Sequence, residues 1–184
     1  MELTEAFQSG QMIWSVDENA FWPRKELLVR WQAKESQMIV YEDTKEAYRI
    51  TALCAVNLNG HFLVRFIKGA CTTLIYSEFL EKLGIVNEKQ SIFAIEDNAA
   101  IHHSAISRIA ANKANITNIF TPPYSPQYNF IEYDFATNKS RLYNCDTGNY
   151  NILTRIVVHI MNNLPSDMQL RLFLKSLREL AHEA

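Results

Sequence analysis

The order of the apolar runs along the chain is the feature that most constrains its fold. Runs of strand length occupy residues 12–16, 50–56, 61–67, 91–95 and 115–120. Apolar positions with helical spacing fill residues 72–83, a segment from about 98 to 113, and residues 130–143. Asn57-Leu58-Asn59-Gly60 is typical of a tight hairpin turn, and Gly84 is expected to end the first of these helices. The sequence therefore predicts an α/β domain in the order strand, hairpin, helix, strand, helix, strand, helix.

Two further apolar stripes with helical spacing close the chain. The first contains Leu153, Ile156, Val157, Ile160, Met161 and Leu164, and the second contains Leu170, Phe173, Leu174, Leu177 and Leu180. Pro165-Ser166-Asp167 separates them and supplies a helix N-cap. We interpret both stripes as core packing, with a homodimer interface as the alternative. The charged residues 24–48 receive no assignment.

This order of elements matches a ribonuclease H-like fold. The expected architecture is an α/β, ribonuclease H-like domain with a mixed five-stranded sheet flanked by helices, followed by C-terminal helices. Residues 1–184 form a single domain in this interpretation, with a core at about 12–143 and a helical extension at about 151–183. In such folds the first strand pairs with the strand that precedes Asp97, so Asp17 and Asp97 are expected to lie side by side.

Composition sets broad limits on location and partners. With 184 residues and 48% hydrophobic content, one domain with a sizeable core is expected. No run of 18 apolar residues and no signal peptide is present, and the three cysteines lack metal-ligand spacing, so an intracellular protein with reduced thiols and no membrane contact is expected. The net charge of −2 does not provide the basic field that is usual in DNA-binding proteins.

Three carboxylates stand out by their positions. Asp17 closes the first apolar run, Asp97 follows the fourth, and Glu132 comes after 34 intervening residues at the start of a helix. Three carboxylates on different elements of one fold can share two divalent metal ions, an arrangement that performs phosphodiester chemistry. Mg²⁺ needs few protein oxygens because it keeps several waters. We therefore predict that Asp17, Asp97 and Glu132 bind two Mg²⁺ or Mn²⁺ ions and are catalytic.

Each acid also has a structural interpretation. Asp97 precedes a helix and has the position of an N-cap. Glu132 lies three residues after Asn129, which is the spacing of a capping box. Glu18 and Asp134 are competing acids whose offsets should point them elsewhere, and Glu96 is expected to face solvent at the end of its strand.

The motifs around these acids resemble the signature of mariner-type transposases and their bacterial insertion-sequence relatives. The resemblance lies in Asp97-Asn98-Ala99 with His102 and Ser104, and in Pro122-Pro123-Tyr124-Ser125-Pro126 with Asn129, Ile131 and Glu132. Asp17-Glu18-Asn19-Ala20-Phe21 resembles the first-strand motif of the family, and the 34-residue interval is its spacing in one branch. Phe135 and Lys139 fall where the family has an aromatic residue and a lysine. Tyr128 and Phe130 depart from it, since the family has leucine and proline there.

The resemblance implies the catalytic (DDE) domain of a metal-dependent DNA transposase. Such a domain cleaves phosphodiester bonds at element ends and transfers the 3′-hydroxyl to target DNA, in the nucleus of a eukaryote or the cytoplasm of a bacterium. It further implies that Asn98, His102 and Lys139 support the acids or contact DNA; the alternatives are a helix cap, a surface histidine and a solvated lysine. The family carries helix-turn-helix modules upstream, and none is expected here because the chain begins almost at the first strand. A catalytically inactive derivative that binds DNA or has a structural role, and another ribonuclease H-like nuclease, are the remaining alternatives.

Overall fold

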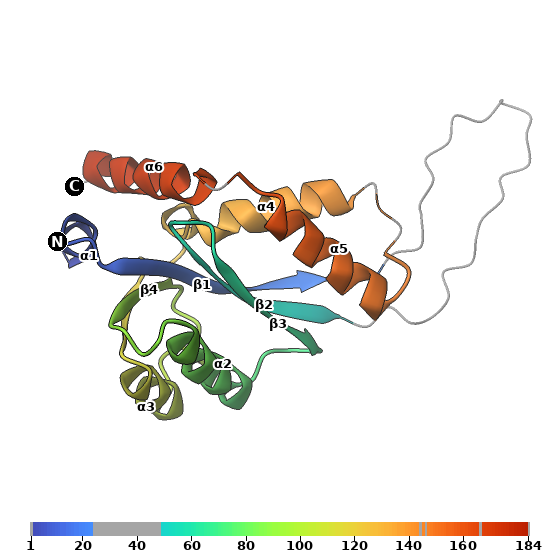
Figure 1. Ribbon diagram of the computed structural model, residues 1–184, viewed down its shortest axis with the longest axis horizontal. Helices are drawn as coiled ribbons and strands as arrows, with labels where there is room; N and C mark the ends of the chain where they lie inside the picture. Colours follow the sequence, from blue (N-terminus) through green and yellow to red (C-terminus); the bar gives the residue numbers. More distant parts are fainter. Residues whose placement is uncertain (1, 24–48, 144, 146, 166, 184) are drawn as a thin grey trace, which may run out of the picture.

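A five-stranded mixed sheet in the order β3-β2-β1-β4-β5 organises the molecule (Figure 1). The computed structural model describes residues 2–23, 49–143, 145, 147–165 and 167–183. The strands are β1 Met12–Phe21, β2 Ile50–Asn57, β3 Phe62–Lys68, β4 Ile92–Glu96 and β5 Ile116–Phe120. β1–β2 and β2–β3 pair antiparallel, whereas β1–β4 and β4–β5 pair parallel. This topology confirms the predicted mixed sheet of a ribonuclease H-like fold.

Helices cover both faces of the sheet. They are α1 Glu2–Gln8, α2 Thr73–Val86, α3 Ala105–Lys113, the 3₁₀ turn η1 Pro126–Tyr128, α4 Ile131–Leu142, α5 Tyr150–Asn162 and α6 Met168–Glu183. α2 and α3 pack together on one face, and α4, α5 and α6 lie on the other, with α1 at the same side (Figure 1). Two separate apolar cores result, one on each face of the sheet.

The central strand β1 contributes to both cores because its side chains alternate between the two faces. Ile13 belongs to the core under α4 and α5, and Trp14 belongs to the core under α2 and α3. By the same alternation Asp17 shares the face of Ile13, and Glu18 shares the face of Trp14. The strand therefore sends its two acids to opposite sides of the sheet.

The C-terminal helices bury their stripes inside the chain itself. Leu153, Val157 and Met161 of α5 and Phe173 of α6 are at most 6% exposed and belong to the core that also contains β1 and β2 residues. This burial confirms the core-packing interpretation of the stripes. Among the described helices, none is long and apolar enough to cross a membrane.

Several element boundaries differ from the prediction. β1 continues to Phe21 instead of ending at Val16, because residues 17–21 pair with β2 throughout. α3 begins at Ala105 rather than near Asn98, since turns occupy the intervening residues and the side chain of Ser104 caps the helix. α1 had no predicted counterpart, and residues 24–48 lie outside the described part of the chain.

Gly84 does not end α2, contrary to the prediction. The helix continues to Val86, and Asn87 is its C-cap. A Cβ atom at Gly84 would lie 2.7 Å from the Cβ of Ala114, which is closer than packed atoms approach. The glycine therefore serves the close packing of α2 against the end of α3, where any side chain would force the two apart.

Candidate active site

A cleft of about 460 Å³ opens where β1, the end of β4 and the start of α4 meet. Its lining consists of Asp17, Asp97, Asn98, Ala99, residues 121–126, Asn129 and Glu132. The three predicted acids and Asn98 thus lie around one cavity, although they come from separate elements. His102 and Lys139 are not part of the lining.

Parallel pairing of β1 with β4 brings the first two acids level with each other. Ser15 of β1 lies opposite Ile95 of β4. Asp17 is two residues beyond Ser15, and Asp97 is two residues beyond Ile95, just past the end of β4. This register confirms that the two acids are neighbours. On the other side of β4, the N–H of Thr121 donates to the carbonyl of Glu96 at 2.8 Å, which places the proline-rich loop at the same edge of the sheet.

Asp17 is a buried acid whose proton is held tightly. Asp17 is only 7% exposed, and its Oδ1 accepts a hydrogen bond from the N–H of Glu18 at 2.6 Å. Burial raises the pKa of Asp17 to about 8, and the nearby charges of Asp97 and Glu132 add to the rise, while the Glu18 hydrogen bond opposes it. Burial is thus the main reason that Asp17 keeps its proton, and the two neighbouring carboxylates are a smaller one.

The surroundings of Asp97 lower its pKa, whereas those of Asp17 raise it. Its Oδ1 accepts from the N–H of Ala99 at 2.9 Å and lies 2.8 Å from Nδ1 of His102. The hydrogen bond from His102 lowers the pKa of Asp97, and it outweighs the effect of partial burial. Because Ser104 caps α3, the interpretation of Asp97 as the N-cap of that helix is wrong.

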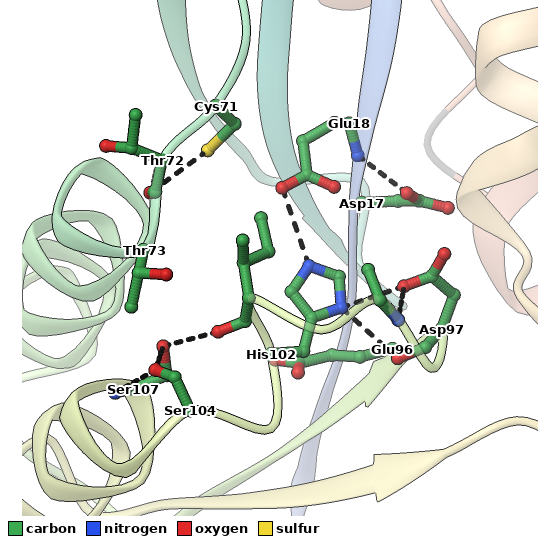
Figure 2. A network of polar contacts seen from close by, with 12 residues as sticks. Asp17, Glu18, Cys71, Thr72, Thr73, Glu96, Asp97, His102, Ser104 and Ser107 are labelled. Atoms are coloured by element: carbon green, nitrogen blue, oxygen red, sulfur yellow. Dashed lines mark hydrogen bonds and ion pairs between the residues drawn. The ribbon is translucent and has the colours of Figure 1, made fainter.

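His102 is completely buried behind Asp97, between two carboxylates (Figure 2). Its Nε2 lies 3.4 Å from Oε1 of Glu18, and its ring packs on Tyr76 with centroids 4.5 Å apart. Burial alone would lower the pKa of His102, but the hydrogen bonds to Asp97 and Glu18 outweigh it and raise the pKa to about 11. The surface-histidine alternative is therefore wrong; His102 orients the Asp97 carboxylate from inside the fold.

Glu132 lies in the first turn of α4 and does not form a capping box. The helix has no side-chain cap, and the N–H of Asn129 donates to the carbonyl of Pro126 at 3.0 Å. Partial burial raises the pKa of Glu132; Lys139 opposes the rise, Asp97 adds to it, and a hydrogen bond with Asp17 also opposes it. Lys139 is exposed two turns further along α4, so it acts on the site through charge.

Asn98 joins the ends of β4 and β5 at the rim of the cleft. Its Nδ2 donates to the main-chain carbonyl of Thr121, and its Oδ1 lies 3.2 Å from Nε2 of His103. His103 is exposed and packs on Phe120, with ring centroids 4.1 Å apart. Asn98 is not a helix cap, because α3 begins seven residues later.

The competing acids point away from the cleft. Glu18 faces α2 and contacts His102, and Asp134 is buried under α6, where its Oδ1 accepts from Nε2 of Gln169 at 3.0 Å. Glu96 was expected to face solvent, but it is fully buried and accepts from Nδ2 of Asn118 at 3.0 Å. That prediction was wrong because the side chain alternation of β4 turns Glu96 into the α2 side of the sheet. Burial raises the pKa of Glu96 to about 7.

Ser15 and the side chain of Asn129 are components of the site that the sequence interpretation missed. Nδ2 of Asn129 donates to Oδ2 of Asp17 at 3.1 Å, and Oδ1 of Asn129 accepts from the hydroxyl of Ser15. The hydroxyl oxygen of Ser15 in turn accepts from the N–H of Ile131 at 3.1 Å. One signal was available: Ser15 is a polar residue inside an apolar run, two positions before Asp17 and hence on the same face.

Phe130 occupies the position where the resembling family has proline. Its φ of −66° is the value that a proline ring imposes, and Asn129 before it is extended, as a residue before proline must be. Phe130 is fully buried, and its ring meets Phe173 edge-on with centroids 5.9 Å apart. Phe130 thus preserves the backbone path into α4. Packing of its ring in the core fixes the φ angle that a proline ring would fix covalently.

The donor set suits a hard divalent cation that keeps much of its own water. Within the described residues, no three acidic, histidine or cysteine side chains converge tightly enough to enclose one ion. The acids instead line an open cleft, and the pKa of Asp17 is raised partly by the charges of Asp97 and Glu132. Uncompensated carboxylate oxygens beside open space fit Mg²⁺ or Mn²⁺, since such ions need only a few protein ligands.

A ribonuclease H-like sheet that carries three carboxylates along one cleft defines a catalytic domain of the polynucleotidyl transferase class. A family model described as "DDE superfamily endonuclease" matches residues 12–149. The chain belongs to this family. A search of curated proteins found no match.

Solved structures of Mos1 mariner transposase share the fold. The Mos1 strand transfer complex matches with a TM-score of 0.74 and 14% identity, covering 97% of this chain and 56% of that protein. The isolated Mos1 catalytic domain matches with a TM-score of 0.69 and 13% identity over 95% of this chain and 82% of that one. A Mos1 paired-end complex with Mg matches at 0.72 with 14% identity, covering 95% and 56% of the two chains. This chain thus spans about half of the Mos1 protein in those complexes and has the fold of its catalytic domain.

Proposed function

We propose that this chain is the catalytic domain of a metal-dependent DNA transposase, which cleaves phosphodiester bonds at element ends and transfers the resulting 3′-hydroxyl to target DNA. The observation that carries the proposal is the gathering of Asp17, Asp97 and Glu132, from three separate elements, around one open cleft. Membership of the DDE superfamily endonucleases supports it. Because the chain spans about half of the Mos1 protein, the activity of a complete transposase is part of the proposal.

Asp17, Asp97 and Glu132 are the residues that would hold Mg²⁺ or Mn²⁺, two ions in the proposed state. When bound, such ions activate a water or a 3′-hydroxyl and stabilise the leaving oxygen of the phosphodiester. The Mos1 structures include complexes whose names specify Mg and Mn, which supports the choice of metal.

The chain's own side chains prepare the site for that chemistry. Asp97 is ionised and fixed in orientation by His102, so it is a ready ligand. Asp17 must release a proton before it can act as one, because its pKa lies at about 8. Asn98 at the rim and Lys139 on α4 would contact the sugar-phosphate backbone, and Lys139 would also offset the charge of Glu132.

DNA is the proposed partner, in the nucleus of a eukaryote or the cytoplasm of a bacterium. Three of the Mos1 structures are named as paired-end complexes, one of them with the left transposon end. With a net charge of −2, this chain alone should bind duplex DNA weakly, without sequence preference, and less well as salt rises. We propose a homodimer only for the assembled transposase.

Nicking of supercoiled plasmid in Mn²⁺, compared between the parent chain and Glu132→Gln, tests the proposal. Gln keeps the length and hydrogen-bonding capacity of Glu, so the variant should stay folded while nicking falls at least about 100-fold, roughly 2.7 kcal/mol. Unchanged nicking would remove Glu132 from the site. Metal binding without any nicking by the parent would favour an inactive derivative, and nicking without strand transfer would favour another ribonuclease H-like nuclease.

A further inference from the structure

We propose that Ser15 and Asn129 are positioning residues that fasten the third acid of the site to the first. The inference rests on the proposed function, because it concerns the same three carboxylates. It starts from the polar connection that runs from the N-terminus of α4 to Asp17, and it assigns a role to two side chains that would not themselves bind the metal.

The connection has a defined direction. The N–H of Ile131 donates to the hydroxyl oxygen of Ser15 at 3.1 Å, and the Ser15 hydroxyl donates to Oδ1 of Asn129. Nδ2 of Asn129 then donates to Oδ2 of Asp17 at 3.1 Å. Both partners require the same orientation of the amide, since Oδ2 of Asp17 accepts from its NH₂ group and the Ser15 hydroxyl donates to its oxygen.

The connection is dry and spans two elements that are far apart in sequence. Ser15 is 0% exposed and Asn129 is 1% exposed, so water does not compete for their hydrogen bonds. Asn129 and Ile131 flank the entry to α4, and Ile131 is the residue directly before Glu132. Ser15 and Asp17 stand two residues apart on one face of β1. The connection therefore fixes the start of α4, and with it the Glu132 backbone, against the strand that carries Asp17.

This arrangement makes the position of Glu132 relative to Asp17 depend on two uncharged side chains. Groups that orient metal ligands without binding the metal typically change metal affinity by 10–100-fold when they are removed. Because Ser15 and Asn129 act in series, loss of either one breaks the same connection. The two substitutions should consequently be far from additive.

Calorimetric titration with Mn²⁺ alone tests this inference on the parent chain, four single variants and one double variant. Ser15→Ala and Asn129→Ala should each weaken Mn²⁺ binding about 10-fold or more, and the double variant should be little worse than either single one. In plasmid nicking by Ser15→Ala, kcat should fall while KM for DNA stays within about twofold, because Ser15 does not line the cleft. Far-UV circular dichroism and thermal unfolding show whether each variant is folded.

Matched controls separate positioning from a general loss of stability. Ser77→Ala removes a buried hydroxyl on α2 that donates to the carbonyl of Thr73, and Asn138→Ala removes a buried amide on α4 that donates to the carbonyl of Asp134. Neither residue lines the cleft, so both controls should lower the melting temperature and leave Mn²⁺ affinity unchanged.

Three results would overturn the inference. If Ser15→Ala and Asn129→Ala bind Mn²⁺ as tightly as the parent, the connection is structural only and the proposed function stands. If the controls lose affinity in proportion to their stability, the effect is not specific to the connection. If the parent itself binds no Mn²⁺, the proposed function fails and the inference falls with it.

Discussion

The two sides of the cleft shift the pKa values of two chemically identical carboxyl groups in opposite directions. On the β1 side, Asp17 is buried, accepts hydrogen bonds from two neutral donors, the N–H of Glu18 and Nδ2 of Asn129, and has a pKa raised to about 8. On the β4 side, Asp97 is half-buried, pairs with His102, and has a lowered pKa. Position on the sheet produces the difference: Asp17 lies within a central strand, and Asp97 follows the end of one.

The difference teaches that one site can hold an ionised and a protonated carboxylate at the same pH. Burial penalises the charged form of Asp17, whereas the cation behind Asp97 favours its charged form. Buried His102, which pairs with Glu18 on the α2 side of the sheet, supplies that cation, so the α2 side of the fold sets the charge state of a group in the cleft (Figure 2).

Asparagine substitutions at the two acids should give the largest effects and should separate the two sides. We expect Asp17→Asn and Asp97→Asn each to lower Mn²⁺-dependent nicking at least about 100-fold, because each removes a charged ligand. Their effects on stability without metal should have opposite signs. At pH 7.5, Asp17→Asn should raise the melting temperature by about 5 °C, and Asp97→Asn should lower it by about 3 °C. Equal shifts in one direction, measured by calorimetry, would contradict the comparison.

Removal of the cation behind Asp97 should affect one side only. His102→Phe keeps a ring against Tyr76 but loses the donor to Asp97, so Mn²⁺ affinity should fall about 10-fold. The matched control is His103→Phe, because the exposed His103 ring packs on Phe120 and contacts Asn98, whereas its hydrogen bond does not involve Asp97. Isothermal titration of both variants provides the measurement. A similar loss in the two variants would show that the buried position of His102 is unimportant.

The pH dependence of the metal-free fold follows from the raised pKa of Asp17. Between about pH 4 and pH 8 this carboxyl keeps its proton in the folded chain and loses it in the unfolded chain, so the folded state binds more protons and its stability falls as pH rises. Metal binding should strengthen over the same interval, by up to about 10-fold per pH unit, because the ion displaces that proton. Titrations with Mg²⁺ from pH 6 to 8 in two buffers of different ionisation enthalpy measure the released proton. Asp97 is already ionised there and should release no proton of its own when the metal binds.

The smallest expected effect concerns the outer partner of His102. The 3.4 Å separation between Glu18 Oε1 and His102 Nε2 is long, and Asp97 remains the closer partner at 2.8 Å. Glu18→Gln should thus reduce Mn²⁺ affinity only about twofold to threefold, well below the effect of His102→Phe. Competition titrations resolve such a difference. An effect as large as that of His102→Phe would mean that the two carboxylates act on His102 as a unit.

Local patterns in the sequence predicted the strands and the acids of the cleft, but not how the cleft is supported. Runs of apolar residues located the five strands, and the motifs around Asp97 and Glu132 located two walls of the cavity. The capping interpretations of Asp97 and Asn129 failed because sequence spacing allows a cap without requiring one. Ser104 caps α3 instead, and the Asn129 side chain binds Asp17 and Ser15 across more than 110 residues of sequence.

Burial of charged residues was the other feature that sequence reasoning could not supply. Glu96 and His102 have no local signal that distinguishes a buried side chain from an exposed one, and both proved fully buried beneath α2 and α3. Their burial depends on tertiary partners such as Asn118, Tyr76 and Glu18, which only the pairing of strands brings into reach.

The alternation of side chains along β1 has a consequence for the kinds of mutation that this chain can survive. Deletion of a single residue between Trp14 and Asp17 would either move Glu18 to the cleft side of the sheet or carry Ile13 and Trp14 into each other's cores, because the alternation cannot be kept on both sides of the deletion. No point substitution disturbs so many contacts at once. Insertions and deletions in β1 should therefore be eliminated during evolution even in copies that have lost their catalytic acids, as long as the fold itself is retained.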